Sequence, residues 1–137
     1  MSYDKFTYDL GSLKLTKAEK AELENEFDDG EYMVCTDETA DSNTKGEILS
    51  NLWAFRPEFL AIETGLPAEV FSCLQEKLSE DSNETVRRLV QSTCGEKSIV
   101  DAAVQNDGRG QFLAFYDGDE QVFTTKTGKV LYVYRCN

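Results

Sequence analysis

The chain has 137 residues with 26 acidic and 14 basic side chains, a formal net charge of -12, and no histidine. Its length suits one domain with a sizeable core, and 40% hydrophobic residues exclude a disordered composition. The lack of histidine excludes Ser-His-Asp and Cys-His nucleophile systems, so we expect a binding protein and not an enzyme. The sequence thus predicts a single domain over residues 1–137.

Membrane and metal sites are also not expected. No stretch reaches the roughly 18 consecutive apolar residues that cross a bilayer. The first ten residues, MSYDKFTYDL, lack the basic and then apolar pattern of a secretory signal, so we expect a cytoplasmic protein. The cysteines form no CxxC pair, and we expect reduced thiols, no metal and no cofactor. These cysteines are Cys35, Cys73, Cys94 and Cys136.

The N-terminal segment predicts one strand or hairpin followed by a helix. Residues 3–15 have apolar side chains at short spacing, which favours a short strand or a loose hairpin. Thr16 and Glu19 have the spacing of a capping box, in which each side chain satisfies a backbone donor of the other residue. This pair predicts a helix over 17–28, and Gly30 is placed to end it.

The middle of the chain predicts mainly helices. Residues 31–36 fit a strand or a short helical piece, and the polar composition of 37–46 predicts a loop. After this loop, apolar residues recur at helical spacing, with Pro57 and Pro67 at helix starts and Gly65 and Gly95 at helix ends. The expected helices cover about 48–55, 57–64, 67–78, 83–93 and 98–104.

The last third predicts strands separated by turns. The expected strands are 112–116 (FLAFY), 121–125 (QVFTT) and 130–136 (VLYVYRC). Helices first and strands last predict an α+β domain. In it, a helical N-terminal and central part packs on a C-terminal three-stranded antiparallel meander.

Residues 59–75, FLAIETGLPAEVFSCLQ, have the pattern of a helix-turn-helix, a motif that often reads DNA. A DNA-reading helix needs Lys or Arg against phosphates. The second helix and its end, 67–81, instead carry four acids and one base: Glu69, Glu76, Glu80 and Asp81 against Lys77. We therefore expect the two helices to pack on each other and the chain not to bind nucleic acid directly.

Acidic residues are concentrated in the first half of the chain. Residues 1–50 hold 13 acidic and 5 basic side chains, whereas residues 51–137 hold 13 and 9. The densest run is ELENEFDDGE, at 22–31. Such a run is usually a solvated helix face, but it can also imitate the phosphate charge of a nucleic acid toward a basic protein. The candidate partner-binding acids are Glu22, Glu24, Glu26, Asp28, Asp29 and Glu31.

Two other sets are candidates for a site. Alternation along the final strands sends some aromatic rings to the surface, where they can anchor a protein partner. These candidate anchors are Phe115, Tyr116, Tyr132 and Tyr134. The polar residues of the intervening turns would serve a small hydrolase or nucleotide-modifying enzyme, although a turn is the simpler interpretation of DGRG and DGDE. That catalytic set is Asp107, Arg109, Asp117 and Glu120.

The C-terminal third also resembles small acidic proteins of unassigned function that are encoded by phages and other mobile elements of bacteria. The residues that carry the resemblance follow the pattern GRGxFLxxYDGxE…YxYR. They are Asp107, Gly108, Arg109, Gly110, Phe112, Leu113, Tyr116, Asp117, Gly118, Glu120, Tyr132, Tyr134 and Arg135. The resemblance implies a bacterial host cell that carries a mobile element, and it implies no mechanism.

Together these features predict a small acidic interaction protein of a phage or mobile element. It would inhibit or modulate a basic, nucleic-acid-handling host protein, in the manner of anti-restriction or anti-CRISPR proteins, with DNA mimicry as one route. One alternative is an accessory regulatory or structural protein that binds a protein partner through its aromatic C-terminal sheet. The other is the small enzyme named above. A homodimer stays open in each case.

Overall fold

The computed structural model describes residues 5–78 and 82–137, and these form two compact units. The sheet unit holds the described residues up to Thr44 together with Gly108–Asn137, and the helical unit is Lys45–Asp107. The elements of the sheet unit are β1 (Phe6–Asp9), α1 (Lys17–Glu26), β2 (Tyr32–Cys35), the start of α2 (Asp37–Ser50), α7 (Arg109–Leu113), β3 (Glu120–Thr124) and β4 (Val130–Arg135). Those of the helical unit are the end of α2, η1 (Leu52–Ala54), α3 (Pro57–Thr64), α4 (Ala68–Leu78), α5 (Ser82–Ser92) and α6 (Glu96–Asp107).

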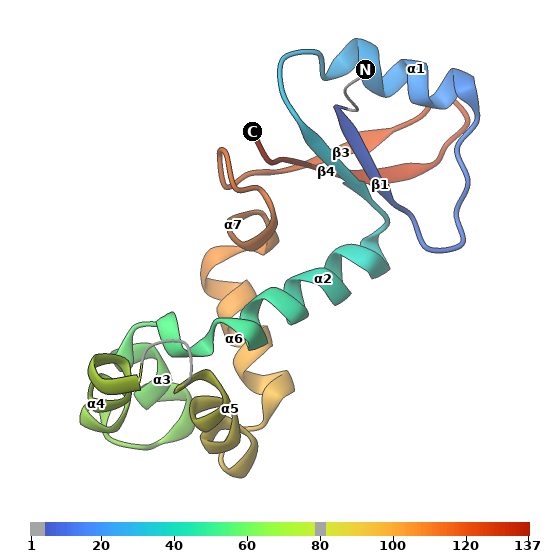
Figure 1. Ribbon diagram of the computed structural model, residues 1–137. Coiled ribbons are helices and arrows are strands. Elements are labelled where there is room, and N and C mark those ends of the chain that lie inside the picture. The colour runs from blue at the N-terminus through green and yellow to red at the C-terminus, as the bar shows by residue number, and fades with distance from the viewer. Residues whose placement is uncertain (1–4, 79–81) are drawn as a thin grey trace. The chain divides into compact units, whose positions relative to one another are not determined.

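The described strands form one mixed sheet in the order β1-β2-β4-β3 (Figure 1). β1 and β2 are parallel and are joined through α1, whereas β4 runs antiparallel to both β2 and β3. The α+β class is confirmed. The predicted C-terminal meander is wrong in its number of strands, because the chain's end contributes a two-stranded hairpin that pairs with strands from the N-terminal part.

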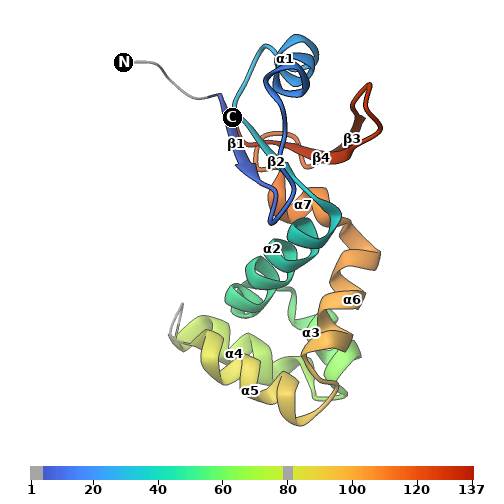
Figure 2. The ribbon, with the colours of Figure 1, turned by 90° about the vertical axis from the view of Figure 1, so that its right-hand side faces the viewer.

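Both faces of this sheet are covered (Figures 1 and 2). α1 lies on one face, where Leu23 and Phe27 pack on alternate residues of the central strands. α7 and the start of α2 lie on the other face, which buries Leu113 and Ala40 against Tyr134. Because neighbouring residues of a strand point to opposite faces, β4 contributes buried side chains to both layers. The buried residues of β4 are Leu131, Val133 and Tyr134.

The strand predicted over 112–116 is wrong. Residues up to Leu113 belong to α7, and a turn follows. The physical reason lies in tertiary contacts, because α7 buries Leu113 and Ala114 against the sheet. Gly110 also brings α7 onto the turn before β3: a Cβ there would lie only 2.5 Å from the carbonyl oxygen of Gly118. These contacts override the strand propensity of the aromatic residues.

The polar loop predicted over 37–46 is also wrong, since these residues belong to α2. Thr36 and Thr39 cap its start, each hydroxyl accepting a hydrogen bond from the other residue's backbone N–H at 3.0–3.3 Å. Ala40, Thr44 and Ile48 are spaced four residues apart and are all buried. The Thr44 hydroxyl donates to the carbonyl of Ala40 at 2.7 Å, which satisfies the one polar side chain in this stripe.

In the helical unit the helices predicted over 57–64, 67–78, 83–93 and 98–104 are confirmed with shifted ends, whereas the segment 48–55 is divided between the end of α2 and the short 3-10 helix η1. Pro57 opens α3, and Gly65 ends it with a φ of 77°, a left-handed conformation that glycine adopts without strain. Asn83 ties helices together, donating to the carbonyl of Leu49 at 3.0 Å and accepting from the N–H of Trp53 at 3.1 Å. The buried core residues of the helical unit are Ile48, Leu49, Leu52, Leu60, Phe71, Val86, Val90, Ile99 and Ala103.

Part of the predicted helix-turn-helix lies outside the described residues. Glu80 and Asp81 belong to that part, whereas Glu69 and Glu76 are exposed on α4. Across residues 5–78 and 82–137, the helices are all too short or too polar to cross a membrane.

Candidate functional site

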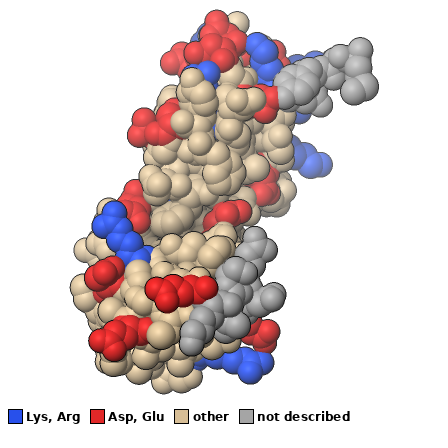
Figure 3. Space-filling model, turned by 60° about the vertical axis from the view of Figure 1, so that its left-hand side comes forward, with Lys and Arg blue, Asp and Glu red and all other residues tan. Residues whose placement is uncertain are grey.

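The acidic run over 22–31 does not form one continuous face. Glu22 accepts a hydrogen bond from the backbone N–H of Lys126 at 2.8 Å, so it is directed toward the β3–β4 turn. Positions two apart on a helix differ by about 200° in direction, so Glu24 faces away from both Glu22 and Glu26. On the face shown in Figure 3, acidic side chains are scattered among other residues. The acids of α1 therefore do not make a phosphate-like row.

The remaining acids of the run meet one predicted aromatic anchor at a surface hollow of about 460 Å³, here called the acidic–aromatic hollow. The turn between α1 and β2 forms one side of it, and the ends of α7 and β4 contribute the other. Its lining residues are Lys5, Asp28, Asp29, Gly30, Glu31, Tyr116, Arg135 and Asn137. Two sets that the sequence predicted separately therefore converge here.

Arg135 is the central side chain of the hollow. Its guanidinium lies 3.9 Å from the centre of the Tyr116 ring, in a cation–π stack. It also donates to the backbone carbonyl of Asp29 at 2.9 Å, and its Nη1 lies 3.5 Å from the Asp29 carboxylate. Gly30 makes this approach possible, because a Cβ there would lie 2.6 Å from the Arg135 Nε.

Asp29 is held in its ionised form. The Tyr32 hydroxyl donates to its Oδ1 at 2.6 Å, and this hydrogen bond, with the charge of Arg135, lowers the pKa of Asp29. Burial, together with the same hydrogen bond, raises the pKa of Tyr32 to about 12. By contrast, Asp28 is exposed, and among the described residues none donates a hydrogen bond to its carboxylate. Asp28 thus offers a free anionic group at the rim.

The aromatic anchors separate into exposed and buried residues. Phe115 and Tyr116 are 68% and 59% exposed, but they lie in the turn after α7 and not on the sheet. Tyr132 is half-buried under Arg109, whose guanidinium lies 4.8 Å from the ring centre. The expectation that Tyr134 is a surface anchor is wrong, because its side chain is fully buried between β4 and α7.

The residues of the alternative catalytic set mostly serve packing. Arg109, whose side chain is 11% exposed, pairs with Glu120 at 2.7 Å and with Asp37 and Asp41 at 2.8 Å each. The Tyr134 hydroxyl donates to the same Glu120 carboxylate, and burial together with this bond raises the pKa of Tyr134. We call these residues, with Tyr132, the Arg109 cluster.

The other two residues of that set do not join the Arg109 cluster. Asp117 accepts from the backbone N–H of Asp119 at 3.0 Å, which is a local turn contact. Asp107 is exposed at the end of α6, in the helical unit. The GRG…YDGxE…YxYR pattern is thus largely a folding motif. Leu113 fills the core, Gly110 permits close approach, and Arg109 holds three carboxylates.

Sequence reasoning missed four residues of the hollow: Lys5, Gly30, Arg135 and Asn137. Lys5 and Arg135 supply its cations, and Gly30 was interpreted only as a helix end. The available signal was the position of Arg135 at the end of a strand, next to a turn rich in acids. The pairing itself joins residues more than 100 positions apart, which no local pattern reveals.

Neither a metal site among the described residues nor a similar known protein was found that would point to a function. Within residues 5–78 and 82–137, no group of His, Cys, Asp or Glu is arranged to hold a metal ion. The four cysteines are free thiols, with Cys35 buried and Cys73 exposed. Comparisons with protein-family models, with curated proteins and with solved structures found no match to this chain.

Proposed function

We propose that the chain is a small acidic interaction protein of a phage or mobile element that acts in the cytoplasm of a bacterial host. It binds a basic, nucleic-acid-handling host protein and inhibits or modulates it. The setting rests on the resemblance of the C-terminal third, and the mode of action rests on the surface described above.

The observation that carries the proposal is the meeting of carboxylates and the exposed Tyr116 ring at the acidic–aromatic hollow, with the exposed Phe115 next to Tyr116 in the chain. Phe115 and Tyr116 are more than half exposed, and Asp28 has a carboxylate that is free of described partners. An arginine fits such a surface well, because its guanidinium stacks on aromatic rings and pairs with carboxylates. Tyr116 already binds one guanidinium, that of Arg135. Aromatic and arginine contacts are also those that dominate binding energy at protein interfaces.

The positions of the acidic side chains favour recognition through a few acids over mimicry of DNA. A DNA mimic needs closely spaced charges along one face, about one per 1.7 Å of axis. Glu24 points away from Glu22 and Glu26, so recognition through a few acids beside an aromatic ring has better support than a phosphate-like row. The net charge of -12 then acts at long range by speeding capture of a basic partner.

The exposed rings alone also support the alternative of an accessory protein that binds through aromatic contacts. The two forms differ in salt dependence. Interactions between exposed charges are screened beyond about 10 Å at 0.1 M salt, whereas apolar contacts are not. Binding that weakens steeply with salt supports the acidic form, and binding that persists supports the accessory form.

The test is capture of host proteins from a bacterial lysate at low and then moderate salt, followed by affinity measurement with the identified protein. Two variants remove carboxylates of the hollow, Asp28→Asn with Glu31→Gln, and the exposed rings at and beside it, Phe115→Ser with Tyr116→Ala. Controls make similar changes at exposed residues elsewhere: Glu47→Gln with Glu58→Gln removes two carboxylates, and Val122→Thr replaces an exposed apolar side chain.

We expect the acidic variant to weaken binding about three- to tenfold at low salt, with the charge control unchanged. We expect the aromatic variant to weaken binding more than tenfold, since anchors of this kind contribute about 2 kcal/mol or more. Equal affinities for the hollow variants and their controls would contradict the proposed site. Absence of any basic partner would contradict the proposed function.

A further inference from the structure

A second surface of the sheet unit has an open strand edge. β1 lies at one end of the strand order, pairing with β2 on one side, and no described strand pairs with its other side. In a parallel ladder, alternate residues direct both their backbone groups to the same neighbour. The carbonyl of Lys5 accepts from the N–H of Tyr32 at 2.7 Å, so Lys5, Thr7 and Asp9 are the residues that face β2. Phe6 and Tyr8 therefore direct their N–H and C=O groups to the open edge.

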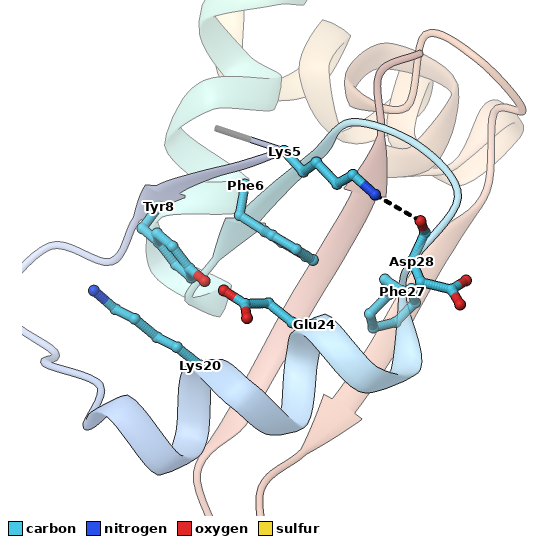
Figure 4. Close-up of a pocket in the computed structure, with 7 residues that line it drawn as sticks. All are labelled: Lys5, Phe6, Tyr8, Lys20, Glu24, Phe27 and Asp28. Carbon is cyan, nitrogen blue, oxygen red and sulfur yellow. Dashed lines mark hydrogen bonds between the residues drawn. The ribbon is translucent and has the colours of Figure 1, made fainter. Parts of the chain in front are cut away.

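A groove of about 540 Å³ lies between this edge and α1 (Figure 4), and we call it the β1–α1 groove. Its volume is typical of binding sites, which span about 300–1,000 Å³. The rings of Phe6, Tyr8 and Phe27 form its apolar walls. Because the side chains of Phe6 and Tyr8 enter the groove, a strand added beside them would direct every second side chain into the same layer.

The charges of the groove favour a basic occupant. The two lysines are engaged: the Lys20 ammonium lies 4.9 Å from the centre of the Tyr8 ring, and Lys5 donates to the backbone carbonyl of Asp28 at 2.8 Å. The carboxylates of Glu24 and Asp28 are exposed, and no described residue donates a hydrogen bond to either or forms an ion pair with it. The described residues of the sheet unit also carry 14 acidic and 8 basic side chains.

The spacing of these groups matches that of a strand. Lys20 and Glu24 are four positions apart on α1, a rise of about 6 Å along the helix, and Asp28 lies two residues beyond its end. Side chains on one face of a strand repeat at about 6.6–6.8 Å. Successive side chains on one face of an added strand would therefore lie opposite successive charged positions of the groove.

We propose that the β1–α1 groove binds an extended basic segment of the protein partner, which adds to the sheet at the edge of β1. An apolar side chain of the segment lies between the three rings, and Arg or Lys two positions away pairs with Glu24 or Asp28. This inference rests on the proposed function, because it assumes a basic protein partner and names the part of it that is bound.

The first test uses the whole chain and a synthetic peptide, acetyl-Thr-Arg-Thr-Leu-Thr-Arg-Thr-amide, which places Leu and both Arg side chains on one strand face. Amide hydrogen exchange is followed by NMR. With peptide at about ten times its Kd, exchange of the Phe6 and Tyr8 amides slows about tenfold. The Thr7 amide exchanges slowly with or without peptide, because it bonds β2. Absence of binding, or binding without slower exchange at Phe6 and Tyr8, overturns the proposal.

The second test separates the groove from general charge attraction. Glu24→Gln removes a groove carboxylate, and Glu26→Gln makes the same change on α1 outside the groove. Glu24→Gln weakens peptide binding about two- to fivefold, the usual range for an exposed ion pair, and Glu26→Gln leaves it unchanged. A peptide of the same composition, acetyl-Thr-Arg-Leu-Arg-Thr-Thr-Thr-amide, places Leu and Arg on opposite faces and binds more weakly. Equal losses in both variants, or equal binding of both peptides, overturn the proposal.

The captured host protein distinguishes this inference from the proposed function. If the first peptide displaces the host protein and Glu24→Gln weakens its capture, the groove is where that protein binds. If the host protein stays bound at saturating peptide and is lost only in the variant Phe115→Ser with Tyr116→Ala, the groove inference fails and the proposed function stands. The two surfaces share Lys5 and Asp28, so variants of those residues are not used for this distinction.

Discussion

The sheet unit contains two arginine–tyrosine stacks that use the same chemistry in different surroundings. Arg109 lies 4.8 Å from the Tyr132 ring centre and Arg135 lies 3.9 Å from that of Tyr116. Arg109 is 11% exposed and pairs with three carboxylates at 2.7–2.8 Å. Arg135 is 21% exposed and has one carboxylate, that of Asp29, at 3.5 Å.

The two arginines differ in how many carboxylates pair with each guanidinium. Arg109 is surrounded by partners from α2 and β3, so removing it would leave several carboxylates facing one another. Arg135 leaves its tyrosine exposed and stands beside acids that lack described cation partners. A satisfied cluster stabilises the fold, whereas an open one keeps groups available for a partner. Measurements of the free energy of unfolding distinguish these two roles.

The largest effect is expected at the glycine beneath the Arg109 cluster. A Cβ at Gly110 would lie 2.5–2.8 Å from backbone atoms of residues 118–120, which cannot move away as a side chain can. Gly110→Ala therefore lowers the free energy of unfolding by about 3 kcal/mol. A Cβ at Gly30 would lie 2.6 Å from the Nε of the flexible Arg135 side chain and 2.6 Å from one backbone atom, the carbonyl oxygen of Asn137. Because it meets fewer backbone atoms than a Cβ at Gly110, Gly30→Ala lowers the free energy of unfolding by about 1 kcal/mol.

The measurement for both glycine variants is urea unfolding followed by far-ultraviolet circular dichroism. Gly46→Ala is the control, since a Cβ at this helical position meets nothing within 4 Å. It is expected to leave stability unchanged or raise it by up to about 1 kcal/mol. A loss at Gly30 equal to that at Gly110 would contradict the difference between the two clusters.

The next effect is the loss of each arginine. Arg109→Met leaves Glu120, Asp37 and Asp41 without their shared cation, and we expect a loss of about 2 kcal/mol, because two of these carboxylates remain well exposed. Arg135→Met is expected to cost about 1 kcal/mol or less, as for a surface ion pair. The same urea titration checks both variants. Equal losses would mean that Arg135 is as structural as Arg109.

Local signals predicted the elements that local interactions determine. Thr16 and Glu19 form the predicted capping box, with hydrogen bonds of 3.2 and 2.8 Å, and α1 begins at the next residue. The strands over 121–125 and 130–136 are confirmed within one or two residues. In each case the deciding contacts lie within a few positions of the chain or within a single hairpin.

Strand pairings and elements that depend on distant contacts were missed. β1 pairs in parallel with β2 across a helix, which a pattern within 3–15 cannot specify. α7 forms where aromatic residues favour a strand, because Leu113 is buried and Gly110 fits against the turn before β3. The roles of some predicted site residues were also missed, because their partners are distant in the sequence. Arg109 was assigned to a turn or to a catalytic set, and its three carboxylate partners became visible only in the fold.

The last and most specific expected effect is on the pH dependence of stability and concerns two carboxylates. Glu19 is buried, with Lys129 at 2.8 Å, and hydrogen bonds from Lys129, Thr127 and Thr16 lower its pKa to about 2. Its ordinary pKa is 4.5. Since the folded state lowers this pKa, its contribution to stability is complete above about pH 4.5 and is lost as pH falls toward 2. Asp29 is shifted in the same direction by Tyr32 and Arg135, but its side chain is 69% exposed.

The measurement is the free energy of unfolding as a function of pH, compared among the wild type, Glu19→Gln and Asp29→Asn. The wild type loses stability between about pH 4.5 and 2, and Glu19→Gln removes a large part of that loss, because Gln does not titrate. Asp29→Asn removes a smaller part, since solvent screens the exposed carboxylate of Asp29. Should Asp29→Asn flatten the curve as much as Glu19→Gln does, the hollow would be as tightly coupled to folding as the buried contacts of α1. Asp29 and Arg135 would then contribute to the fold rather than wait for a partner.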